Sequence, residues 1–208
     1  GDPVAGLDWV GALLNARGRV LPMALEPLVI QGIVLREHGG AFERVQVRGQ
    51  VNLAHEPQVH NIELVPAQAR ACPEALASIE EADWVVLGPG SWRTSVLPHL
   101  LLREQREALS TTNAKRCVVM NLALDDKESN GLDASAHLKL LQQYAPNLRL
   151  DVVIADPSNM GVQSEFEDAA RELGAKVLWA SVRSTTNPNV HDPLKLASAY
   201  NDMFAMRL

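Results

Sequence analysis

The chain of 208 residues is long enough to bury the core of one α/β domain, and 47% of its residues are hydrophobic. Its 19 basic and 25 acidic residues give a net charge of −6, and no long run of Lys or Arg occurs, which argues against a general nucleic-acid-binding protein. No apolar stretch reaches the length of a membrane span, and no signal peptide is recognisable.

The first predicted element is an amphipathic helix over residues 4–16, with Asp2 as its cap and Pro3 in its first turn. Gly1 is not an initiator Met, and a domain seldom opens directly into a helix in this way. We therefore expect the chain to be a fragment or a processed form of a longer protein.

Residues 18–66 form a portion whose pattern favours strands. Two β-rich runs, 28–36 and 42–48, are joined through His38-Gly39-Gly40, which is a hairpin signal. A third strand is expected over 59–65.

From residue 73 to residue 208, helical and strand patterns alternate. Helices are expected over 73–81, 94–110, 134–144, 162–173 and 193–206, and strands over 84–87, 116–121, 151–155 and 176–180. Such alternation predicts βαβ units, with a parallel sheet covered by helices on both faces. The whole chain, 1–208, is thus expected to be a single α/β domain whose ligands bind at the carboxyl ends of the strands.

The two cysteines, Cys72 and Cys117, lie far apart without Cys-x-x-Cys spacing, and each lies in or beside an apolar run. This pattern favours buried free thiols in a reducing cytoplasm over a disulfide.

The turn Gly88-Pro89-Gly90-Ser91 separates the strand 84–87 from the next helix. Glycines let a ligand approach the backbone, and the first N–H groups of a helix attract anions. The hydroxyls of Ser91, Thr94 and Ser95 would add donors. The pattern matches neither the P-loop nor G-x-G-x-x-G, so a phosphate site and a plain strand-to-helix turn both remain open.

Polar residues follow the other strands at the same edge of the sheet. They are Asn121, the acidic loop with Asp125, Asp126 and Glu128, the segment 156–159, and Arg183. Each has a structural alternative: Asn121 as a turn cap, the carboxylates as a solvated loop instead of a cation site, and 156–159 as an ordinary turn. Arg183 would pair with a phosphate or with a surface carboxylate.

None of the six histidines has metal-ligand spacing with another His or Cys. His191 precedes Asp192 and Pro193, where a helix-capping role for Asp192 is favoured over catalysis. Residue order supports neither nucleophilic nor metal catalysis, and no catalytic or metal-binding residue is assigned.

Several segments resemble the YvcK/CofD-like family, often called gluconeogenesis factors. They are residues 17–27, 61–66, 72–83, 87–98, 121–122 and 191–193. The string Gly-Pro-Gly-Ser-x-x-Thr-Ser-x-Leu-Pro at 88–98 is the most specific of them, and it places the chain nearer the YvcK branch.

The resemblance implies a Rossmann-like three-layer fold with a mostly parallel sheet, of which this chain is the carboxyl-terminal part. It implies a regulatory protein that binds a UDP-sugar without turnover and affects carbon metabolism, cell shape and envelope synthesis. The ligand-binding residues would be Gly88, Gly90, Ser91, Thr94, Ser95 and Asn121. The alternative is a magnesium-dependent 2-phospho-L-lactate transferase of deazaflavin cofactor synthesis. The oligomeric state, a homodimer included, is left open.

The chain also departs from the family pattern. The Gly-rich first turn and the Asp-Asp-Gly-Gly stretch are absent, and with them one wall of the nucleotide site. Trp92 and Arg93 replace a common Leu-Tyr, His99 replaces Asn, and Val190 replaces a basic residue before His191. These differences concern the ligand site more than the fold.

Overall fold

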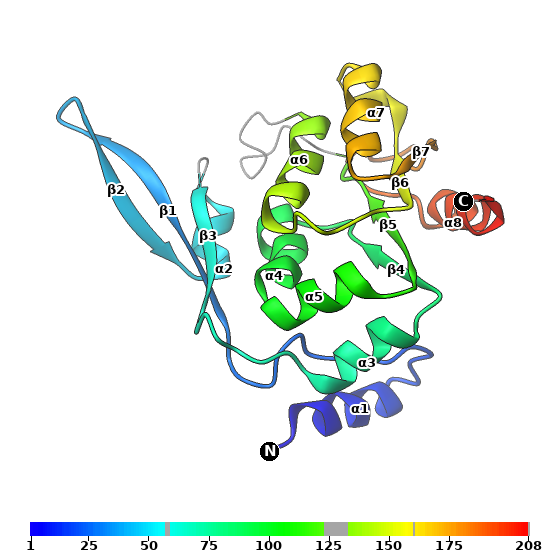
Figure 1. The fold of residues 1–208 in the computed structure, drawn as a ribbon, viewed down its shortest axis with the longest axis horizontal. Helices are drawn as coiled ribbons and strands as arrows, with labels where there is room; N and C mark the ends of the chain where they lie inside the picture. Colours follow the sequence, from blue (N-terminus) through cyan, green and yellow to red (C-terminus); the bar gives the residue numbers. More distant parts are fainter. Residues whose placement is uncertain (57–58, 123–132, 160, 208) are drawn as a thin grey trace.

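The computed structural model describes residues 1–56, 59–122, 133–159 and 161–207. Within these residues lie a three-stranded antiparallel sheet in the order β2-β1-β3 and a four-stranded parallel sheet in the order β4-β5-β6-β7. Figure 1 shows the β1–β2 hairpin projecting to one side, with the parallel sheet and its helices forming the body of the molecule.

The elements follow the predicted order. The strands are β1 (Val29–His38), β2 (Ala41–Arg48), β3 (Val59–Val65), β4 (Trp84–Leu87), β5 (Lys115–Val119), β6 (Val152–Ala155) and β7 (Lys176–Trp179). The helices are α1 (Pro3–Leu13), α2 (Gln50–Ala54), α3 (Pro73–Glu81), α4 (Leu97–Leu101), α5 (Arg103–Thr111), α6 (Ala134–Tyr144), α7 (Gln163–Glu172) and α8 (Pro193–Ala205). A π-helical turn, Trp92–Val96, precedes α4, and a 3-10 turn, Pro157–Asn159, follows β6.

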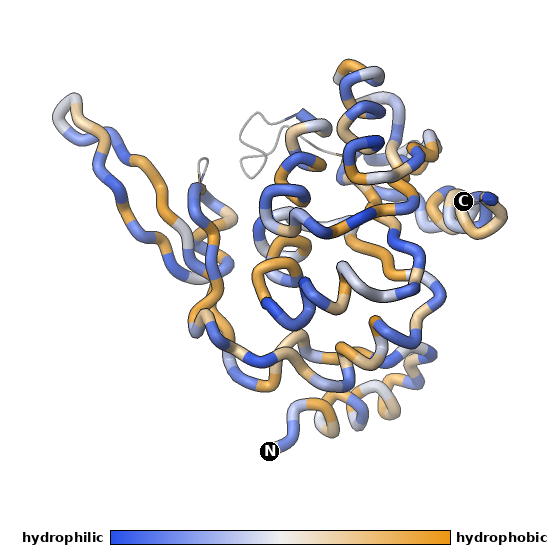
Figure 2. The backbone as a smooth tube through the Cα atoms, viewed as in Figure 1, coloured by the Kyte–Doolittle hydropathy of each residue, from blue (hydrophilic) through white to orange (hydrophobic). Residues whose placement is uncertain are grey.

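The parallel sheet is covered by helices on both faces, as predicted. Alternate residues of a strand face opposite sides, so Val118 packs in one cluster with Leu138 of α6, and Val119 packs in another with Met203 of α8. All four side chains are buried. Figure 2 shows the hydrophobic residues concentrated on these central strands, where a parallel sheet needs them on both faces.

The β-rich portion contains the predicted hairpin and one helix that was not predicted. Gly39 and Gly40 have φ values of 61° and 84°, which suit the tight turn between β1 and β2. After Gly49 the chain forms the five-residue helix α2, whose Leu53 is completely buried. Burial of this one side chain, and not a periodic pattern, accounts for α2.

The single helix predicted over 94–110 is wrong. The chain leaves the helical conformation at Leu102, with φ −76° and ψ 111°, which separates α4 from α5. Leu100 and Leu102 are both almost fully buried. In one continuous helix these residues would point about 200° apart, so the break lets both side chains enter the core.

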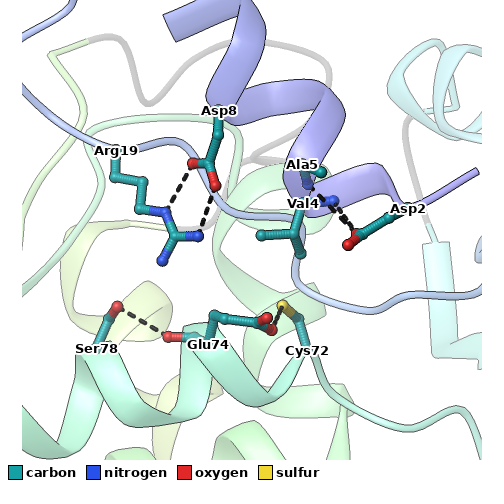
Figure 3. A network of polar contacts seen from close by, with 8 residues as sticks. All are labelled: Asp2, Val4, Ala5, Asp8, Arg19, Cys72, Glu74 and Ser78. Carbon is teal, nitrogen blue, oxygen red and sulfur yellow. Dashed lines mark hydrogen bonds and ion pairs between the residues drawn. The ribbon is translucent and has the colours of Figure 1, made fainter. Parts of the chain in front are cut away.

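The helix α1 ends at Leu13 and not at residue 16, because Asn15 takes a left-handed conformation with φ 50°. Its predicted cap is confirmed: the carboxylate of Asp2 accepts hydrogen bonds from the backbone N–H groups of Val4 and Ala5. Figure 3 shows α1 beside α3, with Val4 turned toward α3 and a solvent-accessible ion pair between Asp8 and Arg19.

Both Cys72 and Cys117 are buried and free, as the sequence predicted. Burial raises the pKa of Cys117 to about 12, so its thiol stays protonated. Among the described helices, none is long and apolar enough to cross a membrane.

Candidate functional site

The turn after β4 is shaped by contacts within the protein. Gly88 has a φ of 76°, and a Cβ added there would lie 2.8 Å from the carbonyl oxygen of Val119 on the neighbouring strand. A Cβ at Gly90 would lie 3.2 Å from the Cβ of Ser95. Gly88 is therefore required by close approach of the chain to itself, and Gly90 lies tightly against Ser95. The sequence pattern did not distinguish these contacts from close approach of a ligand.

The hydroxyls that follow the turn differ in availability. Ser91 caps the helical segment: its Oγ accepts hydrogen bonds from Thr94 N at 3.1 Å and from Thr94 Oγ1 at 2.7 Å. Ser95 is exposed, and its backbone N–H donates to the carbonyl of Ser91. The hydroxyl of Ser95 is thus the one best placed to meet a ligand.

Asn121 lies beside the turn, as its position after β5 predicted. Its Oδ1 accepts a hydrogen bond from the N–H of Gly90 at 3.0 Å, and its Nδ2 donates to the carbonyl of Gly90 at 2.8 Å. The side-chain amide therefore fixes both backbone groups of Gly90. Contact between Asn121 and a ligand stays a prediction.

A cavity of about 290 Å³ adjoins the turn on the side of α3 and α5. Gly88 and Ser95 form part of its wall, and most of the remaining wall is apolar, from β4 and the two helices. The polar part includes His99 and Gln105, which share a hydrogen bond of 2.8 Å. An apolar wall with a few polar groups is typical of small-molecule sites.

Farther along the same edge, directly after β6, lies the buried carboxylate of Asp156. It accepts hydrogen bonds from the N–H and hydroxyl of Ser158 and from the N–H of Val182, and it lies 3.2 Å from Nε of Arg183. Burial would raise the pKa of Asp156, but the hydrogen bonds from Ser158 and the charge of Arg183 outweigh it, so the pKa is lowered. The carboxylate is therefore ionised at neutral pH.

Arg183 and His191 face each other across an isolated antiparallel bridge. Burial lowers the pKa of His191, although a hydrogen bond to the Met120 carbonyl opposes this effect. The sequence predicted that Arg183 would pair with a phosphate or with a surface carboxylate. In the structure it pairs with a carboxylate, that of Asp156, which is buried. Asp192 caps α8, as predicted, by accepting from Leu194 N and Lys195 N.

Sequence reasoning did not include Asp156, Arg183 or His191 among the ligand-binding residues. Asp156 and Arg183 follow the ends of β6 and β7, whereas His191 lies just before α8 and reaches this edge through its bridge to Arg183. For Asp156 and Arg183 topology was the signal available, because both follow strands at the carboxyl edge that also holds Asn121. The acidic loop with Asp125, Asp126 and Glu128 lies outside the described residues. Within the described ranges no group of three or more His, Cys, Asp or Glu side chains forms a possible metal site.

Comparisons with known proteins agree with this fold. Residues 1–183 match the family described as 2-phospho-L-lactate transferase CofD. The chain is 38% identical over 208 residues to a Mycobacterium tuberculosis protein named "Putative gluconeogenesis factor", covering 98% of this chain and 60% of that protein. It is 39% identical over 202 residues to the protein of the same name from Mycobacterium leprae, covering 95% of this chain and 56% of that protein.

A crystal structure of a UPF0052-family protein from Bacillus halodurans superposes with a TM-score of 0.78 at 24% identity. The match covers 96% of this chain and 67% of that one, and it establishes the fold: a parallel sheet of α/β type with an antiparallel sheet before it. The chain thus spans about 60% of the length of the mycobacterial relatives.

Proposed function

Because the chain belongs to the 2-phospho-L-lactate transferase CofD family, on the side of its gluconeogenesis-factor members, we propose that it binds a nucleotide sugar and acts as a regulator without turnover. The observation that carries the proposal is the turn 88–91, which ends a parallel strand, opens a helical segment and is held by Asn121. Parallel α/β sheets bind ligands at this edge.

The proposed ligand places its diphosphate against the turn 88–91 and the helical segment behind it. The exposed hydroxyl of Ser95 donates to a phosphate oxygen, and Thr94 and Ser91 hold the first helical turn in place for it. Asn121 acts through Gly90, because both atoms of its amide are bonded there. The uridine occupies the cavity of about 290 Å³ that Gly88 and Ser95 border.

Isothermal titration calorimetry of the chain with UDP-glucose and UDP-N-acetylglucosamine tests the proposal. Binding is expected, and it should weaken in Ser95→Ala. Ser198→Ala, the same change at an exposed position on α8, is the matched control and should bind as the unaltered chain does. No heat of binding at millimolar ligand would rule the proposal out.

The family description also names a second activity, 2-phospho-L-lactate transfer. That reaction requires a nucleotide-activated donor and a deazaflavin acceptor, with magnesium. Incubation of the chain with both substrates separates the two functions: robust formation of the phospholactyl product would assign the transferase, and binding without product supports the regulator.

A further inference from the structure

Three buried side-chain atoms at the carboxyl edge of the sheet have no hydrogen-bond partner among the described residues: Nε and Nη2 of Arg183 and Nε2 of His191. Nε of Arg183 still has an ion-pair contact, 3.2 Å from the carboxylate of Asp156, which leaves Nη2 of Arg183 and Nε2 of His191 to be explained. Folded proteins rarely leave buried polar atoms unsatisfied, and such atoms often meet a bound group. Nε of Arg116 is also unpartnered, but the Nη1 of that residue donates to the carbonyls of Leu109 and Ser110. At Arg183 and His191 the two remaining atoms occur on facing residues.

The two atoms differ in hydrogen-bonding character. A guanidinium nitrogen is always a donor, so Nη2 of Arg183 requires an acceptor. Burial lowers the pKa of His191, which favours the neutral form of its ring. Each nitrogen of a neutral imidazole is either a donor or an acceptor, so the unpartnered Nε2 requires a group that can fill either role.

The charges around these atoms cancel. The guanidinium of Arg183 is paired with the carboxylate of Asp156. Nearby, Lys195 Nζ donates to the carbonyl of Arg183 at 2.9 Å, and the carboxylate of Asp192 caps α8. Without net positive charge this cluster does not favour a phosphate. It suits a neutral group that both donates and accepts hydrogen bonds, and a sugar hydroxyl does both.

We propose that Arg183 and His191 form a second recognition point, which binds the hydroxyls of the sugar in the nucleotide-sugar ligand. Arg183 donates to one hydroxyl oxygen, and Nε2 of His191 forms a hydrogen bond with a second hydroxyl. This inference rests on the function proposed above.

The segment Met120–Asn121 connects the two ends of the site. Asn121 bonds to Gly90 in the turn, and the preceding carbonyl, of Met120, meets His191. The ends of β4 and β6 are two strand spacings apart, which is about 10 Å. A single ligand with its diphosphate at the turn can therefore reach Arg183 and His191 with its sugar.

The test compares UDP-glucose with UDP by calorimetry. His191→Phe keeps a ring and removes Nε2, so UDP-glucose should bind about five-fold more weakly, whereas UDP, which lacks the sugar, should bind unchanged. His191→Gln restores a hydrogen-bonding group and should recover most of the loss. Arg183→Lys should also weaken UDP-glucose alone. Arg116→Lys, the same change in an Arg–Asp pair at the opposite end of the sheet, should have no effect.

If a variant fails to fold, the inference can still be tested in the unaltered chain. NMR spectroscopy follows the 15N chemical shift of His191 Nε2 there. It should move when UDP-glucose is added and stay with UDP. Equal losses for UDP and UDP-glucose, or an Nε2 shift that ignores the sugar, would overturn the second recognition point while leaving nucleotide binding intact. Absence of binding by either ligand would overturn both proposals.

Discussion

Replacement of Asn121 by Ala tests how the turn 88–91 is held. The change removes two hydrogen bonds, of 3.0 Å and 2.8 Å, and leaves the N–H and the carbonyl of Gly90 without those partners. At about 1 kcal/mol for each bond, the free energy of unfolding should fall by about 2 kcal/mol. For a chain of this size that lowers the melting temperature by roughly 4–8 °C.

Urea unfolding measures the loss in the free energy of unfolding. The slope of that free energy against urea concentration should be the same in the variant and in the unaltered chain. Asn52→Ala is the matched control, because Asn52 makes one exposed hydrogen bond, to the carbonyl of Arg48. It should cost about 0.5 kcal/mol. Asn121→Asp keeps the acceptor for Gly90 N–H and loses the donor, so it should fall between Asn121→Ala and the unaltered chain. An unchanged midpoint for Asn121→Ala would refute the view that this amide holds the turn.

Three further predictions concern groups around the sheet. Because the pKa of Asp156 is lowered in the folded protein, its ionised carboxylate stabilises the fold at pH values above the ordinary carboxyl pKa. This stabilisation is lost as the pH falls through the lower pKa of the folded state. The stability of the unaltered chain should therefore fall more steeply below about pH 4 than that of Asp156→Asn. Cys117, with a pKa of about 12, should resist alkylation at about pH 8.5 until the protein unfolds, and rapid labelling of the native protein would contradict its burial. Asp192→Ala removes two capping hydrogen bonds from α8 and should cost about 1 kcal/mol in thermal unfolding, against no cost for an exposed change such as Asn201→Ala.

The parallel sheet was predictable because its strands carry their own signal. The apolar runs in 84–87 and 152–155 are short, contain β-branched pairs and lie between polar residues, which fits strands buried on both faces. The α2 helix and the break at Leu102 carry no such signal. Each depends on one or two leucines that reach the core only when the rest of the fold is present.

The candidate site was predictable only in part: the sequence placed Asn121 beside the turn 88–91, but not the contacts that these residues make. The rule that parallel strands share a carboxyl edge is enough, with the sequence alone, to bring Asn121 to the turn 88–91. The rule did not reveal that both polar atoms of the Asn121 amide hydrogen-bond Gly90, nor that Arg183 and His191 face each other. Those facts depend on the path of the loop after β7, which residue spacing does not determine.

These contacts separate residues that shape the site from residues that are free to recognise a ligand. Gly88, Gly90 and Asn121 have close or hydrogen-bonded partners within the protein, so the turn needs them with or without a ligand. The exposed hydroxyl of Ser95 and the unpartnered atoms of Arg183 and His191 are different, because the described residues do not complete them. Substitutions in the first group should change stability and binding together, through the position of the turn. Substitution of Ser95 should change binding at nearly constant stability, and it therefore tests function more directly than substitution of the conspicuous glycines does. Arg183 also pairs with the buried carboxylate of Asp156, so its stability has to be measured beside its binding.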